Sequence, residues 1–203
     1  MASLWLAAAP LVLASQSKVR RAVLEAAGIP VEARPAHLDE RAIESQVTSG
    51  RPDDVALTLA REKARTVAAM SEARLVVGCD QTLALGEKRF SKPADRAAAR
   101  AQLLALRGKT HELHSAVAVV RGGALAFGHV AVARLTMRTF SEAFLDAYLD
   151  AAGAGVTASV GAYQLERIGI HLFEKLDGDH FVILGLPLLP LLDYLRQEGA
   201  LAG

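Results

Sequence analysis

The sequence has little of several features that mark large protein classes. It contains one cysteine, Cys79, which excludes an internal disulfide and any zinc site built from several cysteines. Its 23 Lys and Arg residues nearly balance its 22 Asp and Glu residues, so a basic surface that coats nucleic acid is not expected. No apolar run approaches the roughly 18 residues of a membrane span. We therefore expect a soluble, cytoplasmic protein without a stable nucleic-acid complex or a membrane segment.

Several signatures of known enzyme and metal sites are also missing. There is no Gly-x-x-x-x-Gly-Lys-Ser/Thr loop, no Gly-x-Gly-x-x-Gly and no Gly-x-Ser-x-Gly. The absent phosphate-binding loop and nucleophile motif argue against a kinase and a phosphatase. His111 and His114 are three residues apart, and on a strand they would point to opposite faces. A metal shared by these two histidines is therefore not expected.

The chain is long enough for a sizeable core. With 203 residues, 52% of them hydrophobic, it can bury roughly 70% of its unfolded surface. No repeat and no low-complexity linker marks a boundary, so we expect a single domain over residues 1–203. Hydrophobic periodicity predicts strands and helices along the whole chain. The strands are predicted at 11–13, 31–34, 75–85, 111–120, 125–138, 168–173 and 181–184, and the helices at 18–27, 53–69, 95–106, 142–152 and from 187.

One stretch near the N-terminus predicts an anion site. The apolar run Leu11–Leu13 leads into Ser15 and Ser17, and a helix with Arg20 and Arg21 follows. Free backbone N–H groups, the positive end of the helix dipole, two hydroxyls and the cations would meet there. Such a site suits phosphates. The alternative is that Ser17 only caps the helix and the arginines face solvent, and the pattern alone leaves both open.

Two charged residues lie in apolar surroundings. Lys63 falls within the apolar stripe of the helix predicted at 53–69, where it either snorkels at the edge or points at an anion in a cleft. Asp80 follows the apolar run that begins at Leu75. A carboxylate there serves as a metal ligand or a base in many α/β folds, because ligands gather outside strand ends. The alternative is that Asp80 only satisfies a turn.

Eight short motifs follow one another along the chain. They are Ala14-Ser15-Gln16-Ser17 with Arg20-Arg21, Asp39-Glu40, Ala60-Arg61-Glu62-Lys63-Ala64, Gly78-Cys79-Asp80, Lys92-Pro93, Gly108-Lys109-Thr110-His111, Gly161-Ala162-Tyr163 and Gly185-Leu186-Pro187. In this order and spacing they resemble the Maf-like nucleotide pyrophosphatases over nearly the whole chain. The first motif departs from the family: Lys18 replaces the usual proline, and Val19 occupies a position that is often arginine.

The resemblance implies a fold and an activity. The fold is α/β, with a mixed twisted sheet, flanking helices and two lobes around a cleft, as in inosine triphosphatases. The activity is hydrolysis of a nucleoside triphosphate between its α and β phosphates, which gives a monophosphate and pyrophosphate with the help of a divalent cation, Mg²⁺ or Mn²⁺. Such enzymes keep modified nucleotides out of nucleic acids. The oligomeric state stays open, although a homodimer is common in the family.

The resemblance also implies roles for particular residues, and these roles suit the reaction. Phosphoryl chemistry depends on positioning and charge neutralisation. Magnesium is typically held by one or two carboxylates together with substrate oxygens and water. Asp80 is expected to be the general base and, with Glu40, a metal ligand. The residues expected to bind the substrate phosphates are Ser15, Ser17, Arg20, Arg21, Lys63 and Lys92.

Three positions are expected to set the choice of base. Gln81, Glu166 and Val19 resemble the family branch linked to 7-methyl-GTP. An ionised carboxylate accepts hydrogen bonds and suits the N1–H and N2–H₂ donors of guanine. A positively charged 7-methylguanine is favoured further by a negative pocket. The alternative for Glu166 is that it faces solvent or pairs near Arg167. The alternative functions are a dTTP and UTP pyrophosphatase and a non-catalytic nucleotide-binding regulator of cell division.

Overall fold

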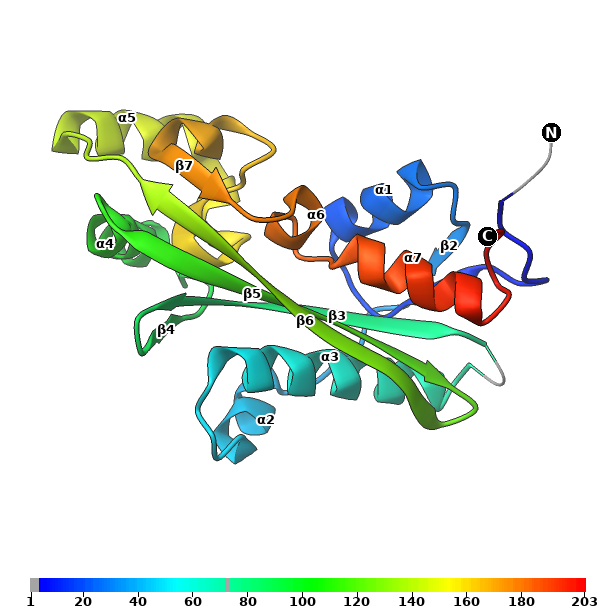
Figure 1. Cartoon of the computed structure of the whole chain (residues 1–203). Helices are drawn as coiled ribbons and strands as arrows, with labels where there is room; N and C mark the ends of the chain where they lie inside the picture. Colours follow the sequence, from blue (N-terminus) through cyan, green and yellow to red (C-terminus); the bar gives the residue numbers. More distant parts are fainter. Residues whose placement is uncertain (1–3, 72–73) are drawn as a thin grey trace.

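The computed structural model of the protein describes residues 4–71 and 74–203. Within these residues a seven-stranded mixed sheet has the order β2-β1-β3-β5-β6-β7, and β4 pairs with β3 outside this path (Figure 1). β1 runs parallel to β2 and β3, and the other pairings are antiparallel. The strands are β1 Leu11–Leu13, β2 Val31–Ala33, β3 Val76–Leu85, β4 Lys88–Phe90, β5 Thr110–Arg121, β6 Ala124–Met137 and β7 Phe173–Asp177.

Helices cover both faces of this sheet. They are α1 Lys18–Ala26, α2 Glu40–Gln46, α3 Pro52–Ala68, α4 Arg96–Leu106, α5 Glu142–Ala152, α6 His180–Ile183 and α7 Leu188–Gln197. Three 3₁₀ turns, η1 Gly153–Thr157, η2 Val160–Ala162 and η3 Ile168–Leu172, follow α5. α3 lies along one face, and α1, α6 and α7 lie on the other (Figure 1). In the part of the chain that the structure describes, no helix is long and apolar enough to cross a membrane.

The alternation of side chains along β3 explains these two layers. Successive strand residues point to opposite faces. Val77 and Cys79 pack with α1 and α7, whereas Val76 packs against α3. A separate core at the other end of the sheet joins Leu83 to α4 and α5. Hydrophobic clusters thus lie on both faces of the sheet and at both of its ends, which agrees with the predicted mixed α/β sheet with flanking helices.

Glycine is needed where α3 crosses β3. A Cβ atom on Gly78 would lie 2.0 Å from the Ala60 carbonyl oxygen and 2.7 Å from the Ala64 backbone nitrogen. No side chain fits there without moving the helix. The close approach brings Lys63 of α3 directly over Asp80, two residues farther along β3.

Two predicted strands were wrong, and some elements were not predicted. The predicted strands at 168–173 and 181–184 are mainly η3 and α6, because apolar runs this short do not distinguish the two states. Asp179 stabilises α6 by accepting hydrogen bonds from the backbone N–H groups of Phe181 and Val182. α2 was not predicted, since it has no buried residue and so no apolar stripe. β4, which contains Arg89, was not predicted either.

Candidate functional site

The candidate site lies where one edge of β3 has no strand partner. β1 pairs with β3 at Val76 and Val77, and β4 pairs with it from Leu83. β5 covers the opposite edge along almost the whole strand. Between β1 and β4, residues 80–82 line a cavity of about 840 Å³, which also receives the loops after β1, β2 and β4. A crevice of this kind at strand ends is a common ligand site in α/β proteins.

The loop after β1 forms one wall of this cavity. The Ser17 hydroxyl caps α1 by accepting a hydrogen bond from the Arg20 backbone N–H at 3.3 Å. The Ser15 hydroxyl oxygen accepts one from the Ser17 N–H at 3.2 Å. The Arg20 guanidinium is fixed, because Nε donates to the Gly185 carbonyl at 2.8 Å and Nη1 to the Cys79 carbonyl at 2.9 Å. Its Nη2 group has no partner among the described residues and is available to an anion.

A buried lysine joins two carboxylates in the same cavity. Lys63 Nζ lies 2.6 Å from Asp80 Oδ1 and 2.8 Å from Glu40 Oε1. The Lys63 and Asp80 side chains are each 11% exposed, while Glu40 is 52% exposed. Burial alone would lower the pKa of Lys63, but the charges and hydrogen bonds of Asp80 and Glu40 outweigh it and raise that pKa. Lys63 therefore stays charged and points into the cleft.

The two carboxylates fit a hard divalent cation. Glu40 and Asp80 already converge on one positive group, the Lys63 ammonium. Across residues 4–71 and 74–203, no group of three or more His, Cys, Asp or Glu residues gathers to hold a metal. Magnesium often takes only one or two protein carboxylates and completes its shell with water and phosphate oxygens. A site with these two ligands would therefore depend on the substrate.

Charge in the cavity is positive on balance. Six Lys and Arg residues and four Asp and Glu residues line it. Lys92 is exposed in the loop after β4 and lines the cavity, as do Lys18 and Val19. The structure does not bring Arg21 to this lining: its Nε donates to Glu25 at 2.7 Å on the exposed side of α1. The arginine pair is thus split between the cavity and the solvent.

The face of β3 opposite Asp80 carries Gln81. Its Nε2 lies 2.9 Å from the Ser115 hydroxyl oxygen, and 3.2 and 3.1 Å from the carbonyl oxygens of Val182 and Ile183. Glu166 lies in the turn between η2 and η3, where it is exposed and lines the cavity. It has no ion-pair partner in the described part of the chain. Gln81 and Glu166, like the third predicted specificity residue Val19, therefore line the cavity that contains Lys63 and Asp80.

Arg89 and Tyr163 are among the cavity-lining residues that were not predicted as site residues. Arg89 lines the cavity, and its Nη1 is buried without a partner among the described residues. Strand alternation in Lys88–Phe90 would have indicated this, had β4 been recognised. Tyr163 lines the cavity too, and its hydroxyl shares a 2.8 Å hydrogen bond with His111 Nε2. Burial lowers the pKa of His111 to about 4, so this imidazole is neutral and serves to support Tyr163.

Cys79 is not a nucleophile in this arrangement. Its thiol is fully buried, in the core between β3 and α7. Burial raises the pKa of this thiol to about 11. Because the thiolate is the reactive form, the thiol is inert at neutral pH.

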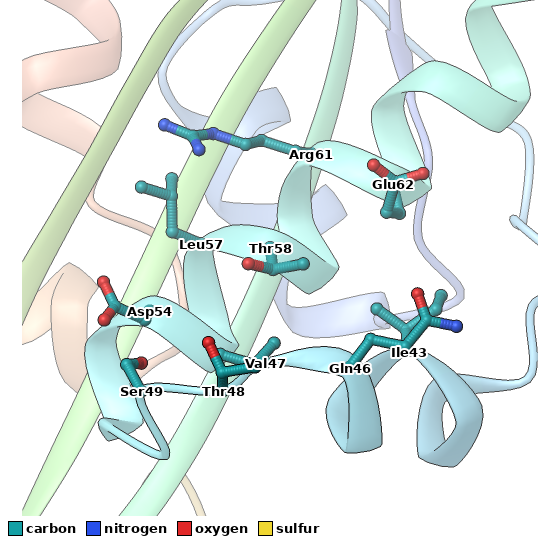
Figure 2. A pocket seen from close by; sticks show the side chains of 10 residues that line it. All are labelled: Ile43, Gln46, Val47, Thr48, Ser49, Asp54, Leu57, Thr58, Arg61 and Glu62. Atoms are coloured by element: carbon teal, nitrogen blue, oxygen red, sulfur yellow. The ribbon is translucent and has the colours of Figure 1, made fainter.

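A second cavity, of about 440 Å³, lies between α2 and α3. Figure 2 shows Thr58 and Glu62 of α3 facing Ile43 and Gln46 of α2, while Arg61 extends away over the sheet. The cavity lining contains none of the predicted site residues. The mixture of charges and apolar groups there indicates no particular ligand.

Comparisons with known sequences match almost the full chain. The profile of the family described as Maf-like protein matches residues 10–198. A nucleoside triphosphate pyrophosphatase from Rhodopseudomonas palustris is 57% identical, covering 98% of this chain and 99% of that protein. A 7-methyl-GTP pyrophosphatase from Mesorhizobium japonicum is 52% identical, with coverages of 95% and 98%. A HAM1 protein from Coxiella burnetii matches with a TM-score of 0.39 and 14% identity, covering 63% of this chain and 72% of that chain. A structural likeness this weak says nothing about activity. The chain belongs to the Maf-like protein family.

Proposed function

We propose that this Maf-like protein is a nucleoside triphosphate pyrophosphatase that prefers 7-methyl-GTP or a related modified guanine nucleotide. The observation that carries the proposal is the convergence of Lys63 on Asp80 and Glu40 inside a cavity with a surplus of cations. Full-length relatives at 57% and 52% identity, named for pyrophosphatase activity, support the same reaction. The role is to remove modified nucleotides before they enter nucleic acids.

Binding of the phosphates follows from the fixed donors. Arg20 is held over the unpaired edge of β3 by two backbone carbonyls, so little of its freedom is lost when it binds an anion. The start of α1 adds backbone N–H groups and the positive end of its dipole. Lys63 and Lys92 supply further charge from α3 and from the loop after β4. These groups favour a polyphosphate whichever base it carries.

Hydrolysis needs one water and one base. The water oxygen forms a bond to the α-phosphorus, the bond from that phosphorus to the pyrophosphate oxygen breaks, and a water proton moves to the Asp80 carboxylate. Asp80 Oδ1 is held by Lys63, whereas Oδ2 has no partner among the described residues and is free to accept that proton. Mg²⁺ or Mn²⁺, held by Glu40 and by the Asp80 oxygen that does not take the proton, would supply charge neutralisation and make the water more acidic.

Recognition of the base rests on two hydrogen-bond acceptors. The Glu166 carboxylate is one, and the Gln81 side-chain oxygen is the other, because the Gln81 nitrogen is already occupied. Guanine offers adjacent N1–H and N2–H₂ donors to such a pair. Uracil and thymine present one N3–H between two carbonyl oxygens, which two acceptors would repel. The positive charge of 7-methylguanine is favoured further beside a carboxylate.

Substrate competition tests this assignment. We expect kcat/KM to be highest for 7-methyl-GTP, and lower for dTTP and UTP. Glu166→Gln should reduce kcat/KM for 7-methyl-GTP by roughly 10- to 100-fold, the usual effect of losing a hydrogen bond to a charged group. Glu174→Gln, which changes another exposed carboxylate outside the cavity lining, is the control and should leave these kcat/KM values unchanged. A wild-type preference for dTTP, or unchanged substrate ratios in Glu166→Gln, would refute the base assignment.

A further inference from the structure

A buried serine holds the Gln81 side chain. Ser115 lies on β5 directly opposite Gln81 of β3, and it is fully buried. Its hydroxyl donates to the Val182 carbonyl at 2.7 Å. Having used its proton there, the same hydroxyl oxygen accepts from Gln81 Nε2 at 2.9 Å. Ser115 therefore links β3, β5 and α6 through one pair of hydrogen bonds.

These contacts leave the Gln81 amide a single orientation. The end of the amide near α6 faces three acceptors, namely the Ser115 oxygen and the carbonyls of Val182 and Ile183. Only an NH₂ group satisfies them, since an amide oxygen in that place would repel both carbonyls. The flip of the amide, which is ambiguous in most glutamines, is decided by chemistry here. The Gln81 oxygen is the end without a partner among the described residues, and Gln81 lines the cavity.

We propose that Ser115 is a positioning residue for base specificity, which acts by fixing the Gln81 amide with its oxygen toward the nucleotide. The inference rests on the proposed function, because it assumes that the cavity binds a nucleotide. Without the Ser115 hydroxyl, Gln81 loses the acceptor that its nitrogen meets at the shortest distance. The amide then turns more easily and presents its NH₂ group, which suits the carbonyl oxygens of uracil and thymine. Discrimination in favour of guanine should fall.

Binding of the monophosphate products tests the proposal without turnover. Dissociation constants of 7-methyl-GMP and UMP are measured by calorimetry for the wild type, Ser115→Ala and Gln81→Ala. We expect the wild type to bind 7-methyl-GMP more tightly than UMP. In both variants the ratio of the two dissociation constants should fall by about five- to tenfold, which is the effect of losing one neutral hydrogen bond. Ser115→Cys keeps a side chain of similar size but offers only a weak donor and acceptor. Its ratio of dissociation constants should therefore lie between those of the wild type and Ser115→Ala. Ser115→Cys also serves as the second variant if Ser115→Ala folds poorly.

Tyr148→Phe is the matched control. It also removes a buried hydroxyl that donates to a backbone carbonyl, that of Ala162 at 3.1 Å, but it does not touch Gln81. This control should lower the stability of the protein without changing the ratio of the dissociation constants of 7-methyl-GMP and UMP. The proposal is overturned if Ser115→Ala and Ser115→Cys keep the wild-type ratio within about twofold while lowering the melting temperature, since Ser115 would then be merely structural. It is equally overturned if Gln81→Ala leaves the ratio unchanged. Neither result depends on whether triphosphates are hydrolysed.

Discussion

Replacing Lys63 by methionine should destabilise the protein through the charge that it leaves behind. Methionine keeps the apolar stem of the side chain against α3 and β3 but removes the ammonium. Asp80, only 11% exposed, then loses the cation 2.6 Å away. Glu40, at 52% exposure, is rehydrated when it loses the same cation. The cost therefore comes almost entirely from Asp80.

The size of the effect follows from these exposures. Removing one partner of a buried ion pair typically costs about 3–5 kcal/mol. The exposed Glu40 contact adds at most about 1 kcal/mol. Because Asp80 lines the cavity and keeps 11% of its side chain exposed, we take the low end and expect Lys63→Met to lower the free energy of unfolding by about 3 kcal/mol. The double variant Lys63→Met with Asp80→Asn should regain about half of the lost free energy of unfolding, because the unpaired Asp80 charge is then absent.

Urea unfolding of the wild type, both single variants and the double variant gives the complete cycle at neutral pH. Arg21→Met is the control, because it breaks an exposed pair with Glu25 and should cost well under about 1 kcal/mol. The reasoning is refuted if Lys63→Met costs no more than this control. It is also refuted if the two single effects simply add in the double variant, because Lys63 and Asp80 would then not be coupled.

Two further predictions concern stability. Burial lowers the pKa of His111 to about 4. Below about pH 6.5 the unfolded chain therefore binds a proton at His111, whereas the folded chain does not. As the pH is lowered from 6.5 to 4, the free energy of unfolding should fall by up to about 3 kcal/mol. His111→Gln should flatten this pH dependence in urea unfolding, and an equal slope in both proteins would contradict the assignment. Gly78→Ala should cost at least about 2 kcal/mol because its Cβ would meet the Ala60 oxygen at 2.0 Å. A melting temperature like that of the wild type would show that α3 moves freely.

The sequence predicted the parts of the site that depend on local pattern. The Ser17 cap followed from a hydroxyl before an amphipathic helix. Lys63 was visible as a charge within an apolar stripe, and Asp80 as a carboxylate after a buried run. Their 2.6 Å contact depends on Gly78, which lets α3 approach β3. Glycine alone does not indicate which helix will approach it.

The remaining parts depend on contacts between distant segments. The orientation of Gln81 is set by α6, which lies about a hundred residues farther along the chain and whose short apolar run reads equally well as a strand. Arg20 and Arg21 look alike in the sequence. They separate only because Arg20 meets the carbonyls of Gly185 and Cys79, while Arg21 meets Glu25 one helical turn away. No local pattern contains that information.

Identification of the reaction products tests the central claim most directly. 7-Methyl-GTP is incubated with the protein and Mg²⁺, and the products are followed by phosphorus NMR. We predict 7-methyl-GMP and pyrophosphate, formed at least about 10²–10⁴-fold more slowly by Asp80→Asn, which should still bind the nucleotide. Formation of a diphosphate and phosphate, or tight binding of the nucleotide without any turnover, as for a regulator, would contradict it.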